Sequence, residues 1–458
     1  MKQLSLSGVL NQEYPAVISF YGAGGKTSLI KGLAAEISAC GQKVLITTTT
    51  KIFIPPGIPL ILGSNEEQIL RKLEEHYRHS AIAVLASAVL PSGKLKGIAP
   101  AAVELIRRKL NLTVLVEADG AGRLPLKGHL QYEPVIPEKS DLIIPVIGAD
   151  ALGKALDHRT AHRADILAAS IGVSEGTVIN EEILARIFKY LKTAGRQQAR
   201  HSRVVPVINK ADLLDAPGKT AWRTAEKIEP GEAGEIMLIT AALDEDPVKF
   251  VLNFRHGHPS VMVNSVILAA GTSSRMGRDK LLLPFGGETV LGHTLKQIKQ
   301  SGIGDPIVVV RPEQCLTGML EEKGYRFVIN EDYRSGIAGS LKAGMKAVDS
   351  CSQAILFALA DQPLIPPALY RQIIDKYMKN FKPVTCPCYA GKRGNPVIFD
   401  RRTWPSLMKL QGDSGGREIL KTIPPSEIDY LTVDTKSILM DIDTEEDYCK
   451  LKDQLPKA

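Results

Sequence analysis

A short turn followed by two basic residues is the segment of this sequence best suited to chemistry on phosphate groups. The apolar run VNSVIL leads into Leu268, Ala269, Ala270 and Gly271. Small residues let backbone N–H groups approach a ligand closely, and Arg275 and Lys280 add fixed positive charge beside that backbone. No Gly-Lys-Thr or Gly-Lys-Ser follows, so the turn is not a Walker loop. We expect it to bind a nucleoside triphosphate.

Carboxylates that could accompany this turn follow later in the chain. Asp361 ends the apolar run AILFALAD, at the edge where open α/β sheets bind ligands. A carboxylate beside a triphosphate is a natural ligand for Mg²⁺, which prefers oxygen. An Asp before Gln-Pro can instead cap a helix, but the turn upstream favours the metal role. Asp441 and Asp443 either add a second carboxylate or begin a helix, where acidic residues are favoured.

A second glycine turn, in AVISFYGAGGKTSLIKGL, has the order strand, turn and helix. Glycines free such a turn, and a lysine and a threonine then open the helix at its anion-binding N-terminus. The residues that we expect to bind phosphate here are Gly22, Gly24, Gly25, Lys26 and Thr27. The full Walker pattern has one more glycine where this chain has Phe20, so the match is a variant.

Two later motifs support a nucleotide site in this first half. LTVLVEADGAG ends an apolar run with Glu117 and Asp119, placed as a Walker-B carboxylate is to reach Mg²⁺. VVPVINKADLLD then supplies Asn209, Lys210 and Asp212, the pattern that reads guanine in many GTPases. The alternative for this tetrapeptide is a surface turn. We expect Asp119 to be a metal ligand, and GTP or ATP to be the nucleotide.

Strand-like apolar runs alternate with helix-like segments along nearly the whole chain, which is typical of α/β proteins with parallel sheets. At 458 residues the chain exceeds one ordinary core. The polar segment FRHGHPSVM separates two sets of strands, each opening with its own phosphate-type turn. We therefore predict two nucleotide-handling domains, residues 1–255 and 262–458.

Composition narrows the classes of partner. Aromatic residues make up only 5% of the chain and the net charge is +7, which argues against nucleic-acid binding and suits anionic small molecules. No apolar run approaches the roughly 20 residues needed to span a bilayer, and we expect a cytoplasmic protein without a membrane partner. The six cysteines are scattered, which argues against a disulfide framework.

The second half resembles the MobA-like nucleotidyltransferases, and in particular the MocA-type molybdenum cofactor cytidylyltransferases. The resemblance rests on four motifs in order over residues 263–458, namely LAAGTSSRMGRDK, DQP, GKRGNPVIF and DIDTEEDY. It implies a three-layer α/β fold of the GT-A or MobA-like kind. It also implies transfer of CMP from CTP to the terminal phosphate of molybdopterin, with release of pyrophosphate.

The resemblance assigns roles to particular residues. Arg275, Lys280 and Mg²⁺ on Asp361 would stabilise the charge that develops during transfer. Guanine-using members tend to carry Leu-Ala-Gly-Gly at the opening, and the methyl group of Ala270 leaves less room, so we favour CTP over GTP. The reference pattern has Gly-His-Pro where this chain has Asn395, which lacks a group that titrates near neutral pH. The choice of acceptor is correspondingly less fixed.

The first half resembles the YqeC family, named as accessory proteins for selenium-dependent molybdenum hydroxylases. GAGGKTSL, TTTTKIF, EADGAGRLPLKGH, YEPVIP and NKAD carry the resemblance over roughly residues 10–250. It implies a P-loop NTPase-like domain that serves the maturation of a molybdenum hydroxylase, with the hydroxylase apoenzyme as a partner.

Two alternatives stay open. The whole chain could be a chaperone-like GTPase that binds the finished molybdenum cofactor without making it. Alternatively, the transferase chemistry could act on a sugar phosphate or polyol phosphate, because fold and function are loosely tied. The complete set of Arg275, Lys280 and Asp361 favours a transferase over a pure binding protein.

Overall fold

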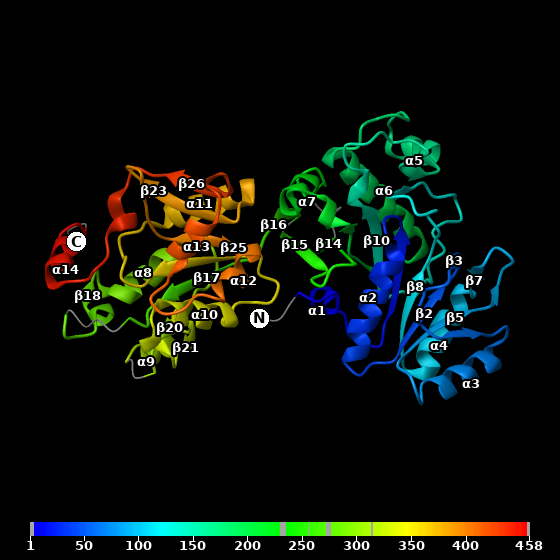
Figure 1. Cartoon of the computed structure of the whole chain (residues 1–458), viewed down its shortest axis with the longest axis horizontal. Coiled ribbons are helices and arrows are strands. Elements are labelled where there is room, and N and C mark those ends of the chain that lie inside the picture. The colour runs from blue at the N-terminus through cyan, green and yellow to red at the C-terminus, as the bar shows by residue number, and fades with distance from the viewer. Residues whose placement is uncertain (1–3, 230–234, 256, 272–275, 313–314, 456–458) are drawn as a thin grey trace. The chain divides into compact units, whose positions relative to one another are not determined.

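The computed structural model describes residues 4–229, 235–255, 257–271, 276–312 and 315–455. The chain divides into two compact units, the first ending at Ser260 and the second beginning at Val261. Both units combine sheets with helices, so the predicted α/β class is confirmed (Figure 1). Within the described residues, no helix combines the length and apolar character needed to cross a bilayer.

The first unit is built on a long sheet whose main order is β16-β15-β14-β13-β10-β1-β8-β2-β5-β4. All pairs from β4 to β14 are parallel, whereas β15 and β16 are antiparallel. The strands are β1 (Val17–Gly22), β2 (Val44–Thr48), β4 (Leu60–Leu62), β5 (Ile82–Ala86), β8 (Thr113–Glu117), β10 (Leu142–Gly148), β12 (Arg203–Val204), β13 (Val207–Asn209), β14 (Ile236–Thr240), β15 (Val248–Arg255) and β16 (His258–Ser260).

Helices and two small sheets surround this sheet. Every residue of β1, β8 and β10 is buried, as expected for central parallel strands covered on both faces. The helices are α1 (Leu6–Leu10), α2 (Lys26–Ala39), α3 (Glu66–His76), α4 (Pro100–Leu110), α5 (Ala164–Ile171), α6 (Glu181–Gln198) and α7 (Pro217–Ala225). In one small sheet, β7 (Lys94–Lys96) lies between β3 (Lys51–Phe53) and β6 (Ala88–Val89). In the other, β9 (Leu126–Lys127) pairs with β11 (Ala161–His162).

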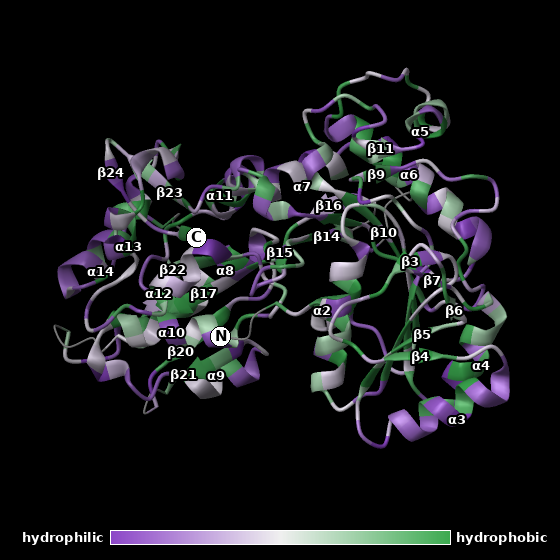
Figure 2. Ribbon diagram, turned by 45° about the vertical axis from the view of Figure 1, so that its right-hand side comes forward, coloured by the Kyte–Doolittle hydropathy of each residue, from purple (hydrophilic) through white to green (hydrophobic). Residues whose placement is uncertain are grey.

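Helix α6 illustrates how the sequence sets the packing. The Asn180 side chain accepts a hydrogen bond from the N–H of Ile183 and so caps the helix. Ile183, Ile187 and Leu191 recur at intervals of four residues and are buried, which leaves the opposite face to polar side chains. The same division is visible elsewhere in the unit, since Figure 2 shows hydrophobic residues along β4 and β5 and hydrophilic ones on α3.

The second unit has a mixed sheet in the order β21-β20-β17-β22-β25-β23-β24, with β26 beside β23. β17 is parallel to both β20 and β22, and β25 is antiparallel to β22 and β23. The strands are β17 (Val263–Leu268), β20 (Ile307–Val310), β21 (Arg326–Ile329), β22 (Ala354–Leu359), β23 (Val384–Tyr389), β24 (Lys392–Arg393), β25 (Val397–Asp400) and β26 (Ile428–Thr432), with the hairpin β18 (Pro284–Phe285) and β19 (Glu288–Thr289).

Helices cover both faces of this sheet. The helices are α8 (Val290–Gln300), α9 (Leu316–Glu322), α10 (Ile337–Ala347), α11 (Pro367–Asn380), α12 (Trp404–Leu407), α13 (Gly416–Thr422) and α14 (Glu445–Lys452). Val266 of β17 and Phe357 of β22 pack with Leu341 of α10 and with Trp404 in one core. The alternate strand residues Ile267, Val308 and Leu356 are equally buried, so the other face is covered as well.

The glycine turn after β1 offers a first test of the fold. Gly24 has a φ of +82°, and a Cβ at this position would lie 2.1 Å from the backbone nitrogen of Gly148. We expect Gly24→Ala to lower the free energy of unfolding of the first unit by more than about 2 kcal/mol, because rigid backbone cannot move aside. Thermal unfolding measures the effect. Gly153→Ala is the matched control, since its φ is +74° and nothing lies within 4 Å; an equal loss there would contradict the packing argument.

Candidate functional site

The second unit brings a lysine and two carboxylates together at the carboxyl end of its sheet. Register pairs Leu268 at the end of β17 with Leu359 at the end of β22, so the residues that follow both strands meet at one edge. The Lys280 Nζ donates to Asp361 Oδ2 at 2.5 Å and to Asp443 Oδ1 at 3.0 Å. Side chains 81 and 163 positions apart from this lysine therefore share one ammonium group.

The helix-cap alternative for Asp361 does not match the geometry, whereas the helix start expected near Asp443 is present. The helix after Asp361 begins only at Pro367, which Pro366 precedes as the N-cap. The helix after Asp443 begins at Glu445, and the capping residue is Thr444, whose side chain exchanges hydrogen bonds with Asp447. Both carboxylates contact Lys280, and Asp443 also lies directly before the residue that caps the last helix. Arg275 lies outside the described residues.

The charge balance of this cluster favours a cation. Burial raises the pKa of Asp361 above its usual range and outweighs the opposing effect of Lys280, and the nearby charge of Asp441 raises it further. Burial lowers the pKa of Lys280, but Asp361 and Asp443 raise it by more, so this lysine stays charged. One ammonium thus faces an excess of carboxylates. Two such carboxylates fit Mg²⁺, which usually takes one or two from the protein and completes its shell with water and phosphate. In the part of the chain that the structure describes, no group of three or more His, Cys, Asp or Glu side chains is placed to hold a metal.

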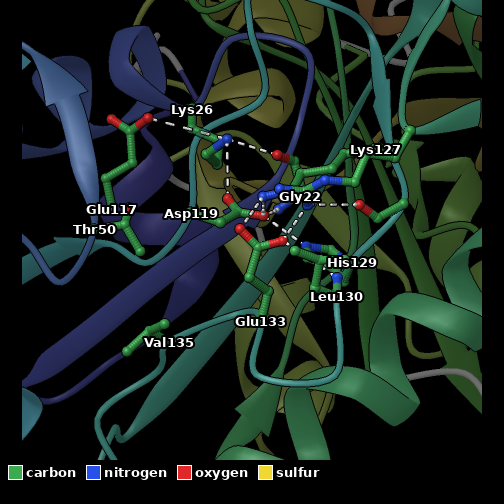
Figure 3. Close-up of polar contacts among 12 residues, drawn as sticks. Gly22, Lys26, Thr50, Glu117, Asp119, Lys127, His129, Leu130, Glu133 and Val135 are labelled. Carbon is green, nitrogen blue, oxygen red and sulfur yellow. Dashed lines mark hydrogen bonds and ion pairs between the residues drawn. The ribbon is translucent and has the colours of Figure 1, made fainter. Parts of the chain in front are cut away.

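The first unit places its glycine turn between β1 and α2, as the sequence predicts. Gly22, Gly24 and Gly25 all have positive φ angles, between +82° and +106°. Lys26 is buried, and its Nζ donates to the carbonyl oxygen of Gly22 at 2.6 Å and lies 3.1 Å from Asp119 Oδ1 (Figure 3). The ammonium group of Lys26 therefore has two oxygen partners within the protein, one from the turn and one from Asp119.

The two carboxylates after β8 contact different groups. Thr27 Oγ1 donates to Glu117 Oε2 at 2.8 Å, and burial raises the pKa of Glu117. Asp119 is fully buried and accepts from the N–H of Gly22 at 3.0 Å. It also lies 3.3 Å from Lys127 Nζ and 2.6 Å from His129 Nε2. Burial alone would raise the pKa of Asp119, but Lys26, His129 and Lys127 hold it far below the usual range.

The Asn-Lys-x-Asp motif is divided between the turn and the surface. Asn209 Nδ2 donates to the carbonyl oxygen of Gly24 at 2.9 Å, and its Oδ1 accepts from Thr240 and from the N–H of Ala242. The Lys210 Nζ donates to Asp150 at 2.6 Å. Asp212 is exposed. The motif residue at the glycine turn is Asn209.

Comparison with known proteins agrees with this division into two units. Residues 18–165 match the family model described as "YqeC protein", and residues 265–428 match the "MobA-like NTP transferase domain". The first half is 32% identical over 205 residues to the uncharacterized protein YqeC of Escherichia coli, covering 43% of this chain and 77% of that protein. The chain belongs to the YqeC family. It joins a YqeC domain to a MobA-like NTP transferase domain.

Relatives of the transferase domain carry several names. The molybdenum cofactor cytidylyltransferase of Escherichia coli is 24% identical, covering 42% of this chain and 96% of that protein. The purine catabolism protein PucB of Bacillus subtilis is 28% identical, covering 40% of this chain and 92% of that protein. Among solved structures, Rv0371c from Mycobacterium tuberculosis H37Rv matches with 30% identity and a TM-score of 0.38, covering 42% of this chain and 99% of that one.

The YqeC domain contains functional candidates that motif reading missed. Lys127 and His129 join the cluster around Asp119, and Lys127 also donates to Glu133 at 3.1 Å. Arg163 contacts the other carboxylate oxygen of Glu133. Lys127, His129 and Glu133 lie in the stretch EADGAGRLPLKGHLQYE. The sequence signal that could have found them is the lysine and histidine that follow the Walker-B-like acids in this stretch. No motif pointed to Arg163.

The transferase domain also contains one such residue. Arg311 directly follows β20, the neighbour of β17, and donates to the carbonyl oxygen of Gly271 and to Asp279 Oδ2. Its position at the carboxyl end of an apolar run, next to the phosphate-type turn, was the signal that could have found it. Arg311 is therefore a third basic residue near the turn, in addition to Arg275 and Lys280, which the sequence analysis identified.

Proposed function

We propose that the transferase domain transfers CMP from CTP to the terminal phosphate of molybdopterin and releases pyrophosphate. The observation that carries this proposal is the contact of Lys280 with Asp361 and Asp443 beside the Leu268–Gly271 turn. The presence of a molybdenum cofactor cytidylyltransferase among the relatives supports the acceptor.

The reaction requires little covalent chemistry from the protein. An oxygen of the molybdopterin phosphate attacks the α-phosphorus of CTP, and the bond between the α-phosphorus and the bridging oxygen to the β-phosphorus breaks. Pyrophosphate carries away the electron pair. Such transfers depend on in-line positioning and on neutralising charge. The turn's backbone and Lys280 hold the triphosphate, and Mg²⁺ held by Asp361 and Asp443 would supply further positive charge.

The preference for CTP rests on the residue type at one position of the turn. Ala270 stands where guanine-using members of the family that this half resembles tend to have glycine, and it is buried in the hydrophobic core with Val266 and Val309. The cytidylyltransferase of Escherichia coli and a probable molybdenum cofactor guanylyltransferase of Thermococcus sibiricus are each 24% identical to this chain. Overall sequence identity therefore does not distinguish CTP from GTP as the substrate. The support for CTP therefore comes from the resemblance at this one position.

Pyrophosphate release tests the proposal. The purified chain is supplied with molybdenum-loaded molybdopterin, Mg²⁺ and either CTP or GTP, and parallel reactions contain a sugar phosphate or a polyol phosphate as acceptor. Turnover with CTP and molybdopterin is the expected result. Turnover with a sugar phosphate alone would replace the acceptor. Absence of release with every acceptor, together with tight binding of the finished cofactor, would favour a cofactor-binding chaperone.

We propose that the YqeC domain binds GTP or ATP at the glycine turn and serves the delivery of the cofactor to a molybdenum hydroxylase. Lys26 and Thr27 begin α2 beside the turn, and Glu117 lies within hydrogen-bond distance of Thr27. Glu117 rather than Asp119 is thereby placed beside the threonine that would share a Mg²⁺ ion with it, and Asp119 as a ligand stays a prediction.

Lys26→Met tests this nucleotide site. We expect the variant to weaken binding of a labelled GTP or ATP analogue at least about tenfold, because the charge that faces the phosphates is lost. Fluorescence anisotropy measures the affinity. Lys31→Met, on the same helix, is the control and should bind as the wild type does. Unchanged binding by Lys26→Met would place the nucleotide elsewhere.

A further inference from the structure

A large groove opens at the opposite edge of the first unit's sheet from the glycine turn. Its volume is about 2080 Å³. Val17 begins β1 and donates to the Asp141 carboxylate in the groove wall, whereas the glycine turn follows Gly22 at the other end of the same strand. A strand of this length separates the two places by roughly 17–20 Å. The groove is therefore distinct from the candidate nucleotide site.

Helix α6 lines the groove with a row of cations. Lys189, Lys192 and Arg196 follow one another at intervals of three and four residues, which places them on one face of the helix over about 10 Å. Arg200 follows just after the end of the helix and lines the same groove. Arg107, Lys139 and Arg203 reach the same groove from other segments.

Acidic side chains balance only part of this charge. Outside the lining, Glu229 lies 3.5 Å from Lys189 and Glu235 lies 3.3 Å from Arg203. Among the described lining residues, seven Lys or Arg side chains accompany three carboxylates. Glu104 forms a bidentate pair with Arg107, and Asp141 accepts from the backbone of Val17. The groove therefore carries an excess of positive charge, and its occupant should be anionic.

The size and the remaining lining residues narrow the occupant further. Small-molecule pockets measure roughly 300–1,000 Å³, so this groove suits a macromolecular segment. Pro100, Ala101, Val135 and Pro137 give it an apolar part, and no Phe, Tyr or Trp lines it within the described residues. Single-stranded nucleic acid is usually held by stacking on aromatic rings. An apolar strip beside a row of cations fits a peptide that carries both carboxylates and apolar side chains.

We propose that this groove docks an acidic, amphipathic segment of another protein. The row of cations on α6 recognises the carboxylates, and the apolar strip accepts the hydrophobic side chains between them. The proposal does not depend on the transferase reaction, because its residues lie in the first unit, at the opposite end of β1 from the glycine turn.

Binding of a labelled peptide tests the proposal on the full chain. The probe is a helical peptide of about 12 residues that is rich in Glu and Leu, and fluorescence anisotropy measures its affinity. We expect Lys192→Glu combined with Arg200→Glu to weaken binding about tenfold or more, because two attractive contacts become repulsive. Rising salt should weaken the wild type steeply and the variant little. Lys139→Glu, in a loop rather than the helix, provides a second variant.

The matched control reverses two exposed cations that lie outside the groove. Arg71→Glu combined with Lys227→Glu changes the net charge equally and should leave binding within about twofold, since distant charges are screened. Pyrophosphate release and the melting temperature should be unchanged in every variant. Equal weakening in the control, or no binding of the peptide by the wild type, would overturn the proposal. Duplex DNA that binds the wild type and fails to bind the groove variants would replace the acidic segment with nucleic acid.

Discussion

Asp361→Ala is expected to lower CTP-dependent pyrophosphate release by about 10²–10³, the cost of losing one group that stabilises transition-state charge. The carboxylate lies 2.5 Å from Lys280 Nζ at the carboxyl end of β22, and burial raises its pKa. Asp443 is the other carboxylate that contacts Lys280, but its side chain is 41% exposed, so we expect it to replace Asp361 only in part. The measurement is the initial rate of release at saturating CTP, with kcat and KM determined separately.

The variant should remain folded, which makes its loss of activity interpretable. Lys280 keeps its contact with Asp443, whose side chain is 41% exposed, so no cation is left buried without a partner. Asp375→Ala removes an exposed aspartate from α11 in the same unit and serves as the control. Asp361→Asn keeps the volume and removes the charge. More than a tenth of the wild-type kcat in both Asp361 variants would show that the reaction does not use this carboxylate.

Asp119→Asn is expected to lower the free energy of unfolding of the first unit by about 3 kcal/mol, because two buried lysines lose their shared carboxylate and keep only one each, Glu117 for Lys26 and Glu133 for Lys127. Lys26 and Lys127 are both buried and lie 3.1 Å and 3.3 Å from this carboxylate. Denaturation in urea measures the change. A Trp404→Phe background leaves Trp222 as the tryptophan that reports on the first unit.

The same carboxylate gives a defined dependence on pH. Its pKa in the folded protein is held far below the unfolded value of about 3.9. Its contribution to stability is therefore complete above that unfolded value and is lost progressively as the pH falls below it. The wild type should lose more stability than Asp119→Asn between about pH 4 and pH 2. Asp165→Asn, on an exposed position of α5, is the control and should behave as the wild type; identical curves for all three proteins would contradict the argument.

The sequence was most informative where an apolar run ends in glycine or acidic residues. Strands β1, β8, β17 and β22 were all predicted from apolar runs, because central parallel strands are buried on both faces and read as continuous hydrophobic segments. The residues at their carboxyl ends, among them Asp361, could then be assigned to one edge of a sheet. These residues become neighbours when their strands are adjacent, and the connection rules of parallel sheets allow few strand orders.

The part that escaped prediction depends on side chains that converge from irregular segments. Lys127 belongs to β9, a strand of two residues, and Arg163 precedes α5 in a left-handed conformation. Neither position has a periodicity that a single sequence reveals. The groove was missed for a related reason, because its cations come from α4, α6, β12 and two loops, and only folding brings them together. The net charge of the whole chain, +7, does not reveal where the positive charges are concentrated.

The lysine of the first glycine turn already has oxygen partners before any ligand arrives. A phosphate group must compete with the Gly22 carbonyl and the Asp119 carboxylate for the Lys26 ammonium, and this competition subtracts from the affinity of every ligand. At the nucleotide site that we propose for this turn, inorganic phosphate and monophosphates would make few contacts in return, whereas a triphosphate would also engage the turn's backbone and a metal ion. The turn would thus act as a threshold on ligand charge, ignoring abundant small anions and responding only to the fully phosphorylated nucleotide.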